Sequence, residues 1–284
     1  MKKILLLGAI IILTQIAQAN TKTLTLRNLE SDMHYQLKEN SIYLEKLTDE
    51  EGFLDYYDRK VTLDYLFGDK EHYDEKGIGV FTNLNPDIAL KITGITSKKK
   101  DIESDIVGFQ LGYKDTDGFM LFDSYSSYLM TANYYSNKYK AIETEDYLIN
   151  LSTQTGRIID ISENTFADVY LTAGAGFYYF GKGQDMNTEI KKDSGFMGNI
   201  GLGMTYNMSF YDFKSYIGGE YMFNYLENIK STPLMEELDK NYIGLVAGLD
   251  YIINERLAIN TKYTVNKLGN DIQHTTSIGF TFLF

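Results

Sequence analysis

Apolar and polar residues alternate along most of the chain, and the final segment shows this pattern most clearly. Ile278, Phe280, Phe282 and Phe284 occupy every second position, and mostly small or polar residues lie between them. Successive side chains of a β-strand point to opposite faces, so this segment is predicted to be a strand with one apolar and one polar face. The same two-residue period recurs through residues 59–284 and predicts an all-β architecture.

The alternation predicts twelve strands. Asn85-Pro86-Asp87 and Asn254-Glu255 have the residue types of tight turns. A turn is expected at 157–164, a polar loop at 97–101 and a long polar loop at 181–195. The faces of residues 119–133 cannot be assigned, because their apolar side chains fall on both phases. Ten strands, with everything before Ile88 forming a separate piece, and fourteen, with a hairpin in residues 20–58, are the alternatives.

Short and long connections tend to alternate along the chain. The short ones are predicted near residues 86, 116, 208 and 254, and the long ones at 68–76, 181–195 and 226–240. Barrels of the outer membrane have short periplasmic turns and longer external loops. An even number of strands then places both ends of the barrel domain on the periplasmic side.

The start of the chain has the layout of a secretory signal peptide. Met1–Lys3 is basic, Ile4–Leu13 is apolar, and Ala17 and Ala19 supply the small residues that a signal peptidase reads. Cleavage is expected after Ala19. The domains are therefore a signal peptide at 1–19, an N-terminal extension at 20–58 that is periplasmic or plugs the lumen, and a barrel at 59–284.

The terminal segment carries a family resemblance. An alternating last strand that contains Phe280 and Phe282 and ends in Phe284 resembles the C-terminal assembly signal of bacterial outer-membrane β-barrel proteins. The resemblance implies a transmembrane antiparallel up-and-down β-barrel in the outer membrane. It also implies contact with the barrel-assembly machinery, with outer-membrane lipid and with lipopolysaccharide.

The chain also resembles, more loosely, the twelve-stranded translocator domain of autotransporters. That family threads an N-terminal helix through the pore, a role that residues 29–58 could fill here. No sizeable passenger precedes residue 29, so protein export is not the expected role.

Composition favours a membrane barrel over a soluble one. The chain has 24 Tyr and 16 Phe, and aromatic residues cluster near the predicted strand ends, as suits the headgroup level of a bilayer. The apolar phase is therefore expected to face lipid, and the polar phase to face a lumen. The predicted lumen-lining residues are Asp64, Lys91, Gln110, Asn199, Lys214, Glu220, Asp250, Asn260 and Lys262.

Several classes of chemistry find no support in the sequence. The chain has no Cys, so it has no disulfide framework, and its net charge of −12 argues against nucleic acid as a partner. His34, His72 and His274 stand in no catalytic arrangement. His72 lies among acidic residues that a solvated loop explains, and Gly174-Ala-Gly176 lies within a predicted strand. We expect no enzyme activity, no cofactor and no metal.

Three functions remain from the sequence. The first is a passive porin-like channel for small hydrophilic solutes, because the lumen phase is polar and carries both signs of charge. The second is a structural or surface-interaction barrel, adhesin-like, with a plugged lumen and working loops at 68–76, 181–195 and 226–240. A membrane-embedded hydrolase acting on lipid or peptide ranks third.

Overall fold

The last strand of the chain pairs with the first and closes a barrel in the computed structural model. β14 (Asp271–Leu283) runs antiparallel to β1 (Lys60–Gly68), with Lys60 opposite Leu283 and Gly68 opposite Thr275. The structure describes residues 29–38, 60–68, 74–85, 87–99, 102–115, 125–139, 142–185, 188–190, 193–226, 241–254, 256–269 and 271–283.

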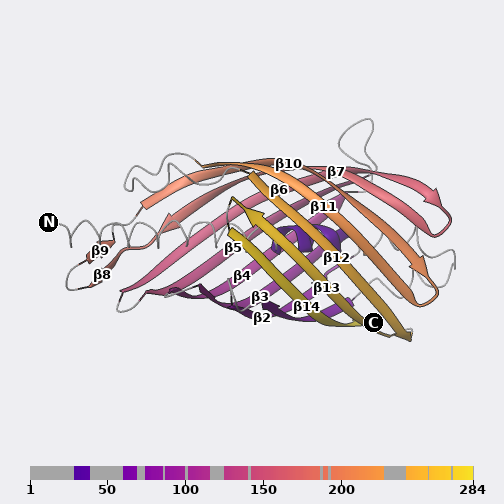
Figure 1. Ribbon diagram of the computed structural model, residues 1–284, viewed down its shortest axis with the longest axis horizontal. Helices are drawn as coiled ribbons and strands as arrows, with labels where there is room; N and C mark the ends of the chain where they lie inside the picture. The colour runs from indigo at the N-terminus through magenta and orange to yellow at the C-terminus, as the bar shows by residue number, and fades with distance from the viewer. Residues whose placement is uncertain are drawn as a thin grey trace.

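Twelve strands form the closed antiparallel barrel, which confirms the predicted fold and strand number. Each strand pairs with its neighbours along the chain, except that β7 pairs directly with β10 because β8 and β9 form a separate hairpin (Figure 1). The remaining strands are β2 (Asp74–Asn83), β3 (Ile88–Lys99), β4 (Ile102–Asp115), β5 (Tyr125–Tyr139), β6 (Ile142–Ser162), β7 (Thr165–Phe180), β8 (Gly183–Asp185), β9 (Thr188–Ile190), β10 (Asp193–Phe210), β11 (Phe213–Leu226), β12 (Asn241–Asn254) and β13 (Leu257–Leu268).

The two openings of the barrel differ. One, which we call the terminal end, holds the start of β1 at Lys60 and the end of β14 at Leu283. At the opposite opening, which we call the loop end, β7 ends at Phe180 and β11 ends at Leu226. The strand order places the turn Glu163-Asn164 at the terminal end.

The barrel is inside out relative to a soluble protein. Its outward phase exposes large apolar side chains, for example Ile200 at 63%, Leu202 at 60% and Ile217 at 62% of their surface. Its inward phase buries polar side chains such as Gln110 and Asn150, both fully. Such an outer face is stable against acyl chains and not against water, so the barrel is built to stand in a bilayer.

Strands extend further than the polar segments of the sequence suggested. β6 runs to Ser162, so the connection expected at 157–164 is only the turn Glu163-Asn164. Likewise β3 ends at Lys99 and β4 begins at Ile102, which shortens the expected loop at 97–101. Polar residues continue these strands because backbone pairing to the next strand does not require apolar side chains.

The described part of the N-terminal extension is a helix over residues 29–38, which Figure 1 shows in indigo within the ring of strands. None of the helical segments among the described residues has the length and apolar character that a membrane-crossing helix needs. Ala17, Ala19, His72 and Phe284, together with the predicted turn near residue 116, lie outside the described residues.

Candidate functional site

The candidate site is the lumen, and the luminal helix, residues 29–38, fills its centre. Leu29, Met33 and Leu37 recur every four residues, so they share one face of the helix. Met33 and Leu37 pack against Phe81, Ala89 and Leu129, a cluster supplied by β2, β3 and β5. Met33 and Leu37 are at most 1% exposed, so this face of the helix is sealed against the wall.

Glycines of β4 leave room for this contact. A Cβ atom at Gly112 would lie 2.5 Å from Leu37 Cδ1, closer than real Cβ atoms approach a neighbour. At Gly108 a Cβ would lie 2.6 Å from Thr93 Oγ1 and 3.7 Å from Leu29 Cδ1. The wall is therefore recessed at residue 112, where the helix lies against it.

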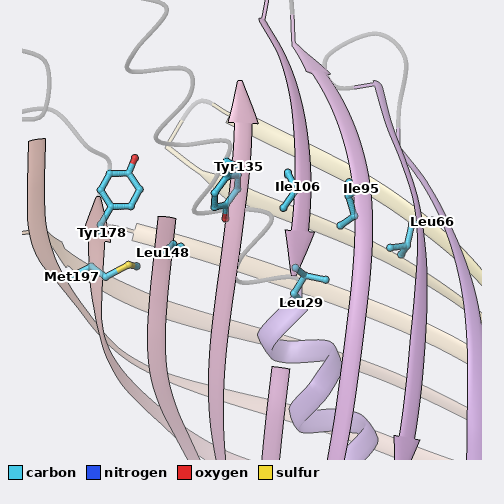
Figure 2. Close-up of a cluster of buried hydrophobic side chains, with 8 residues drawn as sticks. All are labelled: Leu29, Leu66, Ile95, Ile106, Tyr135, Leu148, Tyr178 and Met197. Carbon is cyan, nitrogen blue, oxygen red and sulfur yellow. The ribbon is translucent and has the colours of Figure 1, made fainter. Parts of the chain in front are cut away.

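The beginning of the helix lies toward the loop end. Leu29 packs into an inward-facing apolar belt that includes Ile95 and Ile106, whose strands join at residues 100–101 (Figure 2). This belt interrupts the polar lining of the lumen. It buries the Leu29 side chain among apolar groups, away from water. The members of the belt are Leu66, Ile95, Ile106, Tyr135, Leu148, Tyr178 and Met197.

The carboxylate of Asp32 joins two separate parts of the wall. It accepts hydrogen bonds from Lys91 Nζ on β3 and from Lys262 Nζ on β13, one to each carboxylate oxygen. β14, β1 and β2 lie between these two strands in the barrel. A charged group buried in the lumen needs such partners, because water is largely excluded from it.

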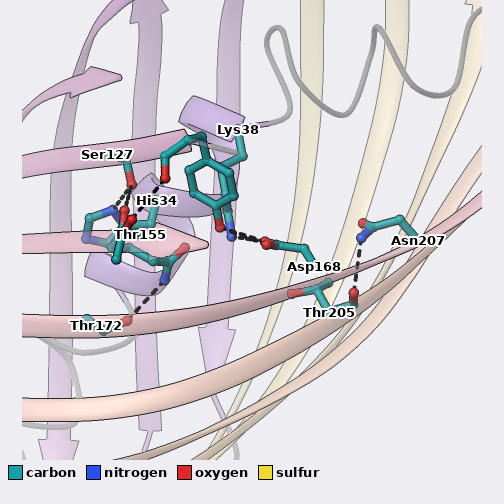
Figure 3. A network of polar contacts seen from close by, with 10 residues as sticks. His34, Lys38, Ser127, Thr155, Asp168, Thr172, Thr205 and Asn207 are labelled. Carbon is teal, nitrogen blue, oxygen red and sulfur yellow. Dashed lines mark hydrogen bonds and ion pairs between the residues drawn. The ribbon is translucent and has the colours of Figure 1, made fainter. Parts of the chain in front are cut away.

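The end of the helix is held by a second ion pair, toward the terminal end. Lys38 Nζ lies 2.8 Å from Asp168 Oδ2 on β7, and both side chains are at most 2% exposed. Tyr125 on β5 donates from its hydroxyl to the same carboxylate. One turn earlier, His34 hydrogen-bonds Ser127 Oγ at 2.8 Å (Figure 3). It also hydrogen-bonds Ser152 Oγ at 3.1 Å.

The remaining wall contacts come from β6 and β11. Ser31 Oγ donates to Glu220 Oε1 at 2.5 Å, and Tyr35 stacks on Tyr216 with ring centroids 4.0 Å apart. Asn150 on β6 donates to Glu30 Oε1. The helix is therefore attached around its circumference and not along one side only.

A cavity remains between the helix and the wall, lined mainly by β7 and by β10 to β13. It is lined by Ser31, Tyr35 and Lys38 from the helix and by Tyr170, Glu220 and Lys262 from the strands. The apolar face of the helix packs on β2 to β5, so the unfilled space lies on its polar face. The cavity borders the ion-paired residues Asp32, Lys38 and Lys262.

The residues that the sequence nominated for the lumen divide into three groups. Lys91, Lys262 and Glu220 contact the helix. Gln110, Asn199, Lys214 and Asp250 are buried in the wall, and Asn260 is half-buried and accepts a hydrogen bond from Thr281. Asp64 lies in β1 opposite Gly79 and Gly279, and its side chain is outside the described part of the chain.

The sequence reasoning did not nominate the helix residues Asp32, His34, Lys38 or Leu37. It suggested a pore-threading helix only as a role that residues 29–58 could fill, and the structure describes residues 29–38 of that range. The signal that could have found the helix is the four-residue recurrence of Leu29, Met33 and Leu37, with Glu30, His34 and Lys38 at the same spacing beside it.

The other described residues that the sequence analysis considered for chemistry lie apart from the helix. Over the described residues, no group of three His, Asp or Glu side chains is placed to hold a metal ion. His274 lies on the outward phase of β14 and hydrogen-bonds the hydroxyl of Tyr263. Gly174 and Gly176 lie inside β7, where their missing Cβ atoms make room for Asn199 and Asn150.

No family model and no curated protein matches the chain. Among solved structures, the fold is similar to the translocator domain of the autotransporter NalP from Neisseria meningitidis. The TM-score is 0.57 at 10% identity, covering 94% of this chain and 100% of that one. LpxR from Salmonella typhimurium has a TM-score of 0.51 at 8% identity, covering 79% of this chain and 100% of that one. At these identities the similarity establishes a shared barrel fold and nothing finer.

Proposed function

We propose that this protein is a non-enzymatic outer-membrane barrel that its own helix holds closed, and that it works through the connections at its loop end. The observation that carries the proposal is the attachment of residues 29–38 to strands on several sides of the lumen. An open porin needs a continuous polar passage, and here Leu29, Met33 and Leu37 lie in that passage against the wall.

The placement of the connections supports a surface role. The strands that precede the segments 69–73, 181–192 and 227–240, namely β1, β7 and β11, all end at the loop end. External loops of outer-membrane barrels are the longer ones, which favours the loop end as the outer side. The apolar outward phase of the barrel would contact outer-membrane lipid and lipopolysaccharide. The barrel-assembly machinery would insert the chain into the membrane.

Conductance in planar bilayers tests the closure. The refolded mature chain should be nearly silent, whereas a variant lacking residues 29–38 should give discrete, stable conductance steps. Heat-modifiable migration on gels must show that both proteins are folded. Equal conductance of the two proteins would instead support the passive porin for small solutes.

A translocator-like role is the second candidate, and the direction of the helix favours it. Leu29 lies toward the loop end and Lys38 toward the terminal end, so the chain enters the lumen from the loop end before β1 begins. Residues before Leu29 would then reach the cell surface. A cysteine introduced at Thr21 should react with a membrane-impermeant maleimide on intact cells; protection until the envelope is permeabilised would exclude this topology.

A further inference from the structure

The ammonium group of Lys38 lies in a cage of three wall residues. Its Nζ is 2.8 Å from Asp168 Oδ2, 4.4 Å from the ring centroid of Tyr170 and 5.4 Å from that of Tyr125. A carboxylate beside aromatic faces is the arrangement that binds organic ammonium ions in proteins. The cage belongs entirely to β5 and β7, whereas Lys38 belongs to the helix.

The cage residues also make contacts that do not involve Lys38. The Tyr125 hydroxyl hydrogen-bonds both oxygens of Asp168, at 2.9 and 2.8 Å, and so orients the carboxylate. A Cβ at Gly156 would lie 2.5 Å from this hydroxyl and 2.8 Å from Asp168 Oδ1, and a Cβ at Gly203 would overlap the Tyr170 ring. The absence of side chains at Gly156 and Gly203 therefore makes room for the cage residues. Tyr125 and Asp168 are fully buried.

The cage borders the cavity beside the helix. Lys38 and Tyr170 both line the cavity on the polar face of the helix, and so does Glu220, which adds a second negative charge near the lysine. A small cation inside this cavity would therefore lie beside the cage while most of the helix stays in contact with the wall.

We propose that Asp168, Tyr125 and Tyr170 form a binding site for primary aliphatic ammonium ions, which Lys38 occupies as a tethered ligand in the closed barrel. The inference rests on the proposed closure, because it names the ligand class that competes with the helix for the wall. A tethered group has a high effective concentration, so free amines bind measurably only when the lysine side chain is removed.

Chemical rescue of a truncated lysine tests the proposal. Lys38→Ala removes three methylenes and the ammonium group, which n-propylammonium replaces. The unfolding midpoint of the K38A barrel in detergent should fall, and millimolar n-propylammonium chloride should raise it again where equal NaCl does not. If K38A alone refolds poorly, the refolding yield with and without the amine gives the same information.

Three comparisons make the result specific. Adding D168N or Y170L to K38A should weaken the response to n-propylammonium about tenfold or more, because each removes one wall of the cage. Tetramethylammonium, which cannot donate a hydrogen bond to Asp168, should bind more weakly than n-propylammonium. K38M, whose apolar side chain fills the cage, should not respond.

A K38A midpoint that n-propylammonium leaves unchanged relative to NaCl, or an equal response of K38M, would overturn the proposal. Conductance separates this result from the proposed function. If n-propylammonium stabilises K38A but the unmodified protein conducts freely, the ammonium site is supported and the proposed closure of the barrel is contradicted.

Discussion

Leu37 of the luminal helix lies against the barrel wall at Gly112 of β4, where any Cβ atom would stand 2.5 Å from Leu37 Cδ1. The helix and this recess are more than seventy residues apart in the sequence, so neither explains the other until the barrel closes. Their fit implies that the helix has one position in the lumen and not a range of positions.

Gly112→Leu should displace the helix. Overpacking of a fitted contact costs about 1–3 kcal/mol, and here the strain is relieved by moving the helix out of the recess. Conductance in planar bilayers should rise while heat-modifiable folding is kept. Gly94→Leu is the matched control, because a Cβ at Gly94 on the outer face of β3 would meet nothing within 4 Å.

Asp32→Asn should loosen the helix by another route. It leaves the buried ammonium group of Lys91 and the partly buried one of Lys262 without their carboxylate partner. Removing one partner of a buried ion pair lowers the free energy of unfolding by about 3–5 kcal/mol. Hydrogen exchange of amides 29–38 should accelerate. Lys138→Gln removes an exposed pair with Glu143, whose side chains are 62% and 75% exposed, and should change stability by less than about 0.5 kcal/mol.

The inverted barrel predicts a depth-dependent cost of charge on the outer face. Leu202→Arg, at the middle of β10, should destabilise the folded barrel in lipid by about 2–4 kcal/mol. Tyr211→Arg, in the turn that follows β10, should cost only about 0–1 kcal/mol. Reversible urea unfolding in vesicles measures both. Equal, small effects at the two positions would indicate that Leu202 does not face acyl chains.

Cysteine labelling of cells tests which end faces outward, and the chain has no natural cysteine to interfere. Lys182→Cys, in the exposed connection at the loop end, should react with an impermeant maleimide on intact cells. Asp212→Cys, in the turn at the terminal end, should react only after permeabilisation. The reverse pattern would place the loop end in the periplasm and remove the proposed surface role.

The barrel could be predicted from the sequence because lipid imposes a simple pattern on its outer face. Ile278, Phe280 and Phe282 alternate with inward residues, and the period of two survives in most strands. β5 was the exception, since Leu129 and Tyr135 are apolar yet point inward while Tyr128 and Met130 point outward. The inward ones contact the apolar cluster around Leu37 and the belt around Leu29, which sequence periodicity alone cannot show.

The luminal site was less accessible to sequence reasoning. Lys91, Glu220 and Lys262 were nominated for the lumen from their phase, but their partners Asp32 and Ser31 lie in a segment with no strand period. Pairs such as Lys38 with Asp168 are separated by 130 residues, and only the closed barrel brings them together. The ten-residue helix carries its apolar recurrence over only three positions, Leu29, Met33 and Leu37, which is a short pattern to recognise in a sequence.

A disulfide between the helix and the recess gives the most direct test that residues 29–38 occupy the lumen. A Cβ at position 112 would lie 3.2 Å from Leu37 Cγ, within the reach of a cysteine pair. The L37C/G112C protein, folded and mildly oxidised, should form the cross-link nearly completely, and L37C/G94C should form none. A folded L37C/G112C barrel in which both thiols stay reduced and react freely with maleimide would contradict the account.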